Sequence, residues 1–248
     1  MNHGNGRAPC ILVVDDSPET LQIVRQTLQK ADFEVRTAIS GEQALKLVSA
    51  TGLPHLAIVD INMPPGMNGI EFAGRLYEFS DVPVIMLTAV DEVQTVVKAI
   101  QEVAEDYMLK PFAPGELVAR VRRVLERVGK FPFAPTCPVT VDEHLSVDFP
   151  ARRLITEDGN YSLTPTEARL LYILMRNTGE TVNTDFILRR MWPRELTYED
   201  RLHVFVHRLR AKLKEVGDQH QYVVSERGIG YRFQPCRETR EDDGDQLR

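Results

Sequence analysis

Residues 11–19, ILVVDDSPE, place four apolar residues directly before two adjacent aspartates. An apolar, β-branched run of this kind predicts a buried strand. Because an unpaired carboxylate is costly to bury, Asp15 and Asp16 are expected at the point where that strand ends. Residues 56–63, LAIVDINM, repeat the pattern, with Asp60 after the apolar run. The sequence therefore predicts two strands that carry carboxylates at their ends.

The first half of the chain alternates apolar, β-branched runs with amphipathic stretches of helical period. The predicted strands are CILVV, EVRTAI, LAIVD, PVIML and YMLK, and the predicted helices cover 18–31, 41–50, 69–79, 91–103 and 114–128. Strands that are apolar throughout are typical of a parallel sheet with helices on both faces. Residues 10–128 are therefore predicted to form a doubly wound α/β domain around a five-stranded, flavodoxin-like parallel sheet.

A second, different domain is predicted after a linker at residues 129–138, where prolines and a glycine interrupt both periodicities. Short strand-like segments lead into LTPTEARLLYILMRN, with Thr164 as the predicted N-cap of a helix. Helices at about 184–191 and 198–215 and the strand-turn-strand YVVSERGIGYRF follow. Three helices and a C-terminal hairpin predict an α+β winged helix over residues 139–236. The remaining segments are predicted to be an N-terminal extension, 1–9, and a polar, disordered tail, 237–248.

Composition favours a protein of the cytoplasm. No apolar run approaches the roughly 18 residues of a membrane span, and residues 1–9 lack the apolar stretch of a secretory signal. The three cysteines are far apart and odd in number, which favours reduced thiols. The formal net charge of −6 argues against nucleic acid, yet residues 187–214 carry eight basic residues against three acidic ones. A local patch of this kind matters more for binding than the total charge.

Five polar side chains are predicted to meet at one edge of the first sheet. Asp15 and Asp16 close the first strand and Asp60 the third, which are neighbours at the switch point of a flavodoxin-like sheet. Two carboxylates about 4 Å apart repel by about 4 kcal/mol at an effective dielectric constant of about 20. Oxygen ligands of this kind suit Mg²⁺. Thr88 and Lys110 are predicted at the ends of the next two strands, so the sequence predicts a phosphoryl-accepting site. In this site Asp60 is the nucleophile, Asp16 and Asp60 bind Mg²⁺, and Thr88 and Lys110 hold the transferred oxygens.

Residues 10–128 resemble a response-regulator receiver domain, the CheY-like phosphoacceptor fold. The motifs that carry the resemblance are Asp15-Asp16, Asp60 followed by Met63 and Pro64, Thr88-Ala89 and Lys110-Pro111. The resemblance implies a metal set of Asp15, Asp16, Asp60 and the backbone carbonyl of Asn62. It also implies that Tyr107 is an aromatic switch that turns inward when the threonine engages the phosphoryl group. In DINMPPGMNG, Asp60 and Gly69 are one residue further apart than in the usual pattern, which predicts a longer surface loop.

Residues 139–236 resemble the DNA-binding domain of OmpR/PhoB-type regulators. The segments that carry this resemblance are LTPTEARLLYILMRNTGETV, VFVHRLRAKL and RGIGYRF, in family order. In the basic helix, one apolar stripe leaves the cations on the remaining surface. The candidate DNA contacts are Arg201, His203, His207, Arg208, Arg210, Lys212, Ser225 and Arg227. Two positions depart from the family: Phe205 stands where a histidine is common, and His203 where an acid is common.

Together the resemblances imply a transcriptional regulator controlled by phosphorylation. The implied partners are a sensor histidine kinase that supplies the phosphoryl group, double-stranded DNA with tandem half-sites, and a second copy of the chain, with contact to the transcription machinery left open. The candidate dimer face is Lys98, Glu105, Asp106, Glu116, Arg120 and Arg127. Two other functions stay open: an aspartyl-phosphate enzyme such as a phosphatase, and a degenerate receiver that dimerises without phosphate.

Overall fold

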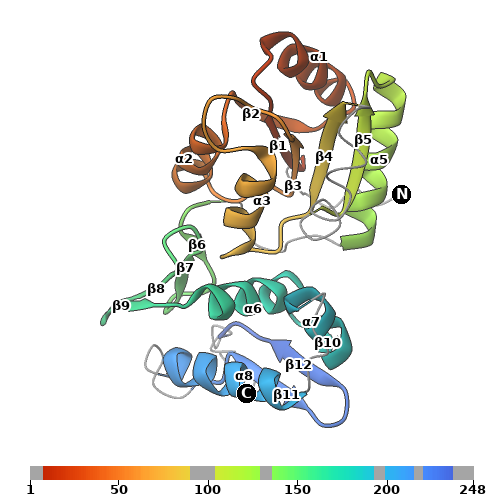
Figure 1. The fold of residues 1–248 in the computed structure, drawn as a ribbon. Coiled ribbons are helices and arrows are strands. Elements are labelled where there is room, and N and C mark those ends of the chain that lie inside the picture. The colour runs from red at the N-terminus through yellow and green to blue at the C-terminus, as the bar shows by residue number, and fades with distance from the viewer. Residues whose placement is uncertain (1–7, 90–103, 129–135, 193–198, 215–219, 237–248) are drawn as a thin grey trace, which may run out of the picture.

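The computed structural model describes residues 8–89, 104–128, 136–192, 199–214 and 220–236. Its first part is a five-stranded sheet in the order β2-β1-β3-β4-β5, and every pair in it is parallel (Figure 1). The elements are β1 (Cys10–Val14), α1 (Pro18–Gln29), β2 (Glu34–Ala38), α2 (Gly41–Thr51), β3 (Leu56–Asp60), α3 (Gly69–Tyr77), β4 (Val84–Ala89), β5 (Asp106–Lys110) and α5 (Pro114–Val128). This confirms the predicted doubly wound fold, while the predicted helix at 91–103 lies outside the described residues.

The sheet is apolar on both faces because helices cover each of them. All residues of β1 and β3 are buried. Ile11 and Val13 pack with the buried residues of α1 and α5, whereas Leu12 and Val14 pack with those of α2 and α3. Side chains alternate between the two faces of a strand, so a strand covered on both faces has to be apolar at every position. This explains why the run before Asp15 contains no polar residue.

The second part combines two antiparallel sheets with three helices. The first sheet, in the order β6-β7-β8-β9, comprises β6 (Val139–Thr140), β7 (Ser146–Asp148), β8 (Arg153–Thr156) and β9 (Gly159–Ser162). The helices are α6 (Pro165–Arg176), α7 (Thr184–Met191) and α8 (Glu199–Lys214). A three-stranded sheet, β10-β12-β11, closes the unit with β10 (Thr181–Asn183), β11 (Val223–Glu226) and β12 (Gly230–Phe233). This is the predicted winged-helix arrangement.

Local signals set most of these boundaries. The capping box predicted at Thr164 is present, because the Thr164 hydroxyl accepts from the Glu167 N–H and the Glu167 carboxylate accepts from the Thr164 N–H. The strand β10 was not predicted from the sequence. It is only three residues long, and its place is set by pairing with β12. A run this short is below the length at which alternation is informative.

The cysteines and the helices bear on two features that composition predicts. The three cysteines are free, as predicted. Among the described residues, no helix combines the length and the apolar character needed to cross a membrane.

Side chains of the two parts contact one another directly. The Arg190 guanidinium of α7 donates to the Asp81 carboxylate at 2.8 Å and to both Glu105 oxygens at 3.2 and 3.0 Å. Arg152 pairs with Glu78 at 3.0 Å, and the Arg176 Nε donates to the Val128 carbonyl at 2.9 Å. The ion pairs of Arg190 are largely buried. Arginines of the second part therefore meet acidic residues of the first, a contact that charge counting did not predict.

Candidate functional site

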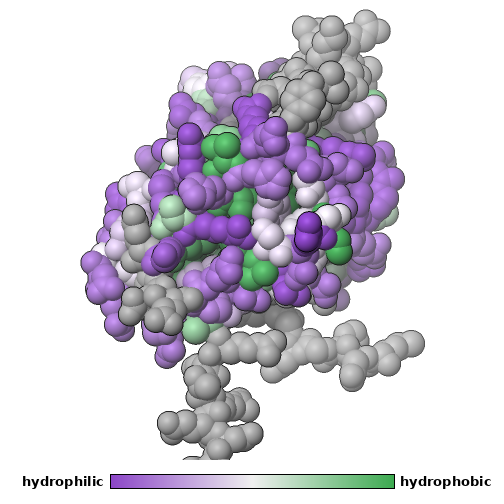
Figure 2. All heavy atoms as spheres, turned by 90° about the horizontal axis from the view of Figure 1, so that it is seen from below, coloured by the Kyte–Doolittle hydropathy of each residue, from purple (hydrophilic) through white to green (hydrophobic). Residues whose placement is uncertain are grey.

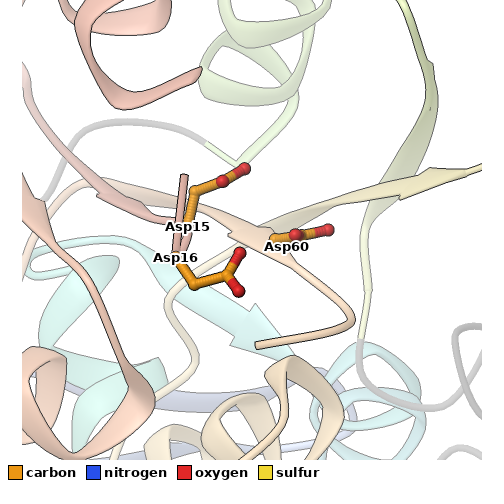
Figure 3. A group of neighbouring side chains, drawn as sticks. All are labelled: Asp15, Asp16 and Asp60. Atoms are coloured by element: carbon orange, nitrogen blue, oxygen red, sulfur yellow. The ribbon is translucent and has the colours of Figure 1, made fainter. Parts of the chain in front are cut away.

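Three carboxylates converge at the carboxyl edge of the parallel sheet. Asp15 and Asp16 follow β1 directly, and Asp60 ends β3, its neighbour in the sheet (Figure 3). One ligand oxygen from each of them lies within 4.8 Å of the others. Asp15 and Asp60 are buried, whereas Asp16 is exposed. The predicted meeting of these residues is thus confirmed, and one side of the cluster is open to solvent.

Lys110 compensates the buried charges. Its ammonium lies 2.7 Å from the Asp15 Oδ2 and 3.0 Å from the Asp60 Oδ2. The second oxygen of Asp15 accepts a hydrogen bond from the Ser17 N–H at 2.9 Å. Asp15 is wholly buried, but its carboxylate is paired with Lys110 and accepts hydrogen bonds from Lys110 and from the Ser17 N–H. A buried carboxylate is tolerated at the end of β1 because both of its oxygens are satisfied.

The cluster shifts the pKa of two of its members. Burial, opposed by Lys110 and reinforced by the charges of Asp15 and Asp16, raises the pKa of Asp60 above its usual range. Burial alone would lower the pKa of Lys110, but its hydrogen bonds to Asp15 and Asp60 raise it instead, so the ammonium stays charged. Ionised Asp60 is therefore held at a cost in free energy. A cation bound to its oxygens would offset that cost.

The donor set fits Mg²⁺. The cluster offers carboxylate oxygens alone, which are the ligands that Mg²⁺ and Ca²⁺ prefer and that softer metals do not. Mg²⁺ in proteins commonly binds one or two carboxylates and keeps several waters. The exposed side at Asp16 allows those waters to remain.

Three further predicted site residues, Thr88, Tyr107 and Asn62, lie on β4, on β5 and after β3. Thr88 is buried near the end of β4, and its hydroxyl donates to the Ala89 carbonyl at 3.2 Å. Tyr107 is 47% exposed on β5, so its ring lies outward. Asn62 is exposed two residues after the acceptor. The roles predicted for Thr88 and Tyr107 as a switch and for the Asn62 carbonyl as a metal ligand stay predictions.

Sequence reasoning missed how closely Gly69 approaches the acceptor. The Gly69 N–H donates to the Ile61 carbonyl at 2.9 Å, so the loop after β3 returns to its own start. A Cβ at position 69 would lie 2.0 Å from the Asp60 carbonyl oxygen and 2.9 Å from a Val59 methyl. The longer loop predicted from the spacing is therefore pinned to the acceptor strand at this glycine. The sequence shows a glycine at the start of α3, but it does not show that this glycine lies against the Asp60 carbonyl.

The basic helix α8 turns one stripe inward and exposes the rest. Its buried residues are Leu202, Val206, Leu209 and Leu213, as the periodicity predicts. Of the candidate DNA contacts, Arg201, His203, His207 and Arg208 are exposed on α8, and Ser225 and Arg227 are exposed on the hairpin. Gly228, at the hairpin turn, has a φ of +74°, a conformation that glycine adopts without strain. From below, where α8 and the hairpin lie in Figure 1, the surface is mostly hydrophilic with small hydrophobic areas (Figure 2).

Several of the candidate contacts bind groups within the chain. His203 is one of them, because its Nδ1 lies 2.6 Å from the Tyr231 hydroxyl. The Arg210 guanidinium donates to the Val223 carbonyl and to the Ser225 hydroxyl, both at 2.8 Å. The Lys212 ammonium donates to the Ser162 carbonyl and to the Glu167 carboxylate, both at 2.7 Å. These cations join α8 to β11 and to the start of α6. Their predicted DNA contacts stay a prediction, because each side chain already has internal partners.

The predicted dimer face is a set of ion pairs within one chain. Arg120 lies 2.9 Å from Asp106 and 2.8 Å from Glu116, and Arg127 lies 3.0 Å from Glu105. Lys98, the remaining residue of this face, lies outside the described residues. The charges expected to pair between two copies thus pair first with one another, and the dimer stays a prediction.

Comparison with known proteins gives matches to both parts of the chain. A family model for the response regulator receiver domain matches residues 11–122, and one for the C-terminal part of transcriptional regulatory proteins matches residues 158–233. The DNA-binding response regulator MtrA of Mycolicibacterium smegmatis is 37% identical over 226 residues, covering 91% of this chain and 96% of the relative. The transcriptional regulatory protein ResD of Bacillus subtilis is 34% identical over 233 residues, covering 90% and 95%. KdpE of Mycobacterium tuberculosis is 33% identical over 225 residues, covering 90% and 98%.

Proposed function

Because this chain belongs to the family of OmpR/PhoB-type DNA-binding response regulators, we propose that phosphorylation of Asp60 controls its binding to promoters. The family is one of transcriptional regulators and not of classical enzymes. The proposal includes its place in the cytoplasm and its division into a receiver at 10–128, a linker at 129–138 and a DNA-binding domain at 139–236, with segments 1–9 and 237–248 outside both.

The observation that carries the proposal is the position of Lys110 between Asp15 and Asp60. An Asp60 oxygen attacks the phosphorus of a phosphohistidine on the kinase, so that a P–O bond forms as the P–N bond breaks and the leaving nitrogen takes up a proton. Lys110 is close enough to Asp60 to pair with the incoming phosphoryl oxygens. Slow hydrolysis of the same acyl phosphate would return the protein to its first state.

The acidic residues supply the metal ligands. Asp15, Asp16 and Asp60, with the backbone carbonyl of Asn62, would hold Mg²⁺, which when bound neutralises charge on the phosphoryl oxygens. Residues of the chain then rearrange around the negative charge of the phosphoryl group. The Thr88 hydroxyl exchanges its bond to the Ala89 carbonyl for a phosphoryl oxygen, and the space it leaves admits the Tyr107 ring.

The interface between the two parts suggests how that change reaches DNA. Glu105, on the face proposed for the homodimer, is held by Arg127 and also by Arg190 of α7. The Glu105 carboxylate cannot pair fully with Arg190 and with a second copy of the chain at the same time. The two arrangements therefore compete, and a shift of Tyr107 two residues away would bias the competition. Dimerisation would in turn raise the effective concentration of two DNA-binding domains over tandem half-sites.

The proposed function is tested by intact-protein mass with acetyl phosphate as the donor, with and without Mg²⁺, and by light scattering in parallel. We expect one phosphoryl addition that requires Mg²⁺, mapped by borohydride reduction to the peptide containing Asp60, together with a higher proportion of dimer. Continuous release of phosphate without a stable adduct would indicate an aspartyl-phosphate enzyme instead. No addition under any condition would indicate a degenerate receiver.

Removing the Arg190 side chain is expected to loosen the contact between the two parts. Arg190→Ala leaves Asp81 and Glu105 without their shared partner, so we expect the unphosphorylated protein to dimerise and to bind selected operator DNA about tenfold more tightly, a shift of about 1.4 kcal/mol. Light scattering and a DNA titration measure this. Arg189→Ala, an exposed neighbour on the same helix, is the matched control and should bind as the wild type does. Equal affinities for the two variants would contradict the competition.

A further inference from the structure

The loop between the acceptor strand β3 and α3 is fastened to the start of another helix. α2 and α3 lie side by side on one face of the sheet (Figure 1). The Met67 N–H donates to the Glu42 Oε1 at 2.8 Å, across 25 residues of sequence. Glu42 is in the first turn of α2, which begins at Gly41. The loop that leaves the acceptor is therefore tied to a helix that precedes β3 in the chain.

Two glycines allow the loop and the helix to come this close. Gly66 has a φ of +112°, and a Cβ there would lie 2.8 Å from the Glu42 Oε1. A Cβ at Gly41 would lie 2.9 Å from the Met67 Sδ. Met67 also packs against the core. A side chain at either glycine would displace the Glu42 carboxylate or the Met67 side chain, so the hydrogen bond is one part of a close contact between loop and helix.

The loop begins at the acceptor and ends at α3, and both of these ends are bonded to the fold. The Ile61 N–H donates to the Leu87 carbonyl at 3.1 Å, and Asn68 caps α3. Between them, the exposed residues 64–65 are prolines and have no N–H to donate. The bond from the Met67 N–H therefore connects the exposed half of the loop to a regular element of the fold.

The same hydrogen bond keeps the Glu42 carboxylate ionised. The Met67 N–H lowers the pKa of Glu42 below its usual range. A hydrogen bond to an ionised acceptor is stronger than one between neutral groups. An acidic residue in the first turn of a helix also interacts favourably with the helix dipole, so the charge of Glu42 and its hydrogen bond have separate effects. Glutamine at this position would separate them, because its oxygen accepts the hydrogen bond without carrying a charge.

We propose that Glu42 is a positioning residue for the metal at the acceptor site, because it holds the loop that carries the Asn62 carbonyl. The inference rests on the proposed function, in which that carbonyl binds Mg²⁺ together with the three carboxylates of the cluster. A loop that is free to move must be ordered when it binds a ligand, and the loss of freedom weakens binding. The bond to Glu42 orders the loop beforehand. In this role Glu42 acts through the loop and is not itself a metal ligand.

The first measurement is direct binding of Mg²⁺ to the unphosphorylated full chain by isothermal titration calorimetry. We expect Glu42→Ala to weaken Mg²⁺ binding about fivefold, because one charge-assisted hydrogen bond is lost, and Glu42→Gln to stay within about twofold of the wild type. Gln43→Ala is the matched control. Gln43 also accepts a hydrogen bond in the first turn of α2, but from the Ile39 N–H and not from the loop, so this variant should bind Mg²⁺ as the wild type does.

Phosphoryl uptake and amide hydrogen exchange give two further readouts. In Glu42→Ala the rate of uptake should reach half its maximum at about fivefold more Mg²⁺. The rate at saturating Mg²⁺ should stay unchanged, because the lost bond affects metal binding and involves no reacting atom. In the metal-free protein, residues 61–68 should exchange faster in Glu42→Ala than in the wild type, Glu42→Gln or Gln43→Ala.

The positioning role would be overturned in several ways that leave the proposed function intact. Equal Mg²⁺ binding by Glu42→Ala and the wild type would mean that the loop does not need this bond. Equal weakening in both Glu42 variants would assign the effect to charge alone. Unchanged exchange of residues 61–68 would mean that Glu42 does not hold the loop. Failure of the wild type to bind Mg²⁺ or to take up a phosphoryl group would overturn the proposed function as well.

Discussion

Replacing Asp60 by asparagine is expected to abolish phosphoryl uptake while leaving the protein folded. Asparagine has nearly the same shape and can still accept a hydrogen bond from Lys110, but its amide cannot form the acyl phosphate. Intact mass after incubation with acetyl phosphate and Mg²⁺ should show no addition at all. The wild type, treated in parallel, should gain one phosphoryl group.

The same variant should also reveal how the cluster affects stability. Because burial raises the pKa of Asp60, the folded protein binds the Asp60 proton more tightly than the unfolded chain does. The stability that this carboxyl contributes is therefore present below its unfolded pKa and is lost as the pH rises through its folded pKa. Asparagine does not titrate, so in metal-free buffer Asp60→Asn should be more stable than the wild type at neutral pH, and the difference should disappear in acid. Urea unfolding at several pH values measures this.

A matched control is available in the same domain. Asp32 is an exposed aspartate with a φ of 67°, a backbone conformation that asparagine also adopts readily. Asp32→Asn should take up one phosphoryl group and show the pH dependence of the wild type. Labelling of Asp60→Asn to the same extent as this control would mean that another residue is the acceptor.

The parts of the site that the sequence could predict are those set by strand order. Asp15, Asp16 and Asp60 follow apolar runs that only a sheet covered on both faces would contain, and such sheets gather their chemistry at one edge. Lys110 was predictable for the same reason, because it ends the last strand of that sheet. The short segments of the winged helix were read from a capping box and from the turn residues of the hairpin. In each case a local pattern fixed the place of the residue.

The parts that could not be predicted depend on contacts between segments far apart in the sequence. Lys212 and Glu167 are 45 residues apart, so nothing local shows that a cation of the basic helix supports the start of α6. The contact of Arg190 with Asp81 spans 109 residues and crosses from one part of the chain to the other. Charge counting placed both cations in a basic patch. It could not show which of them the protein itself neutralises.

Gly69 leaves no room for a side chain beside the Asp60 carbonyl. Gly69→Ala is therefore expected to lower both the stability of the fold and the rate of phosphorylation. An added methyl would lie 2.0 Å from the Asp60 carbonyl oxygen, a backbone atom that cannot move without moving the acceptor. We expect the free energy of unfolding to fall by about 3 kcal/mol, and the rate of phosphoryl uptake by about 100-fold in the fraction that folds, because a displacement of about 1 Å at a reacting group costs that much. Urea unfolding and the time course of labelling measure the two effects.

Gly74→Ala separates this effect from the general cost of changing a glycine. Gly74 lies in the same helix, α3, and a methyl there would meet no atom within 4 Å. Alanine favours a helix interior over glycine by about 1 kcal/mol, so this control should be more stable than the wild type and should label at its normal rate. If Gly69→Ala behaved as Gly74→Ala does, the loop after β3 would be free to move away from the acceptor. The extra residue between Asp60 and Gly69 would then only lengthen the surface loop, and the close contact would not help to hold Asp60 in position.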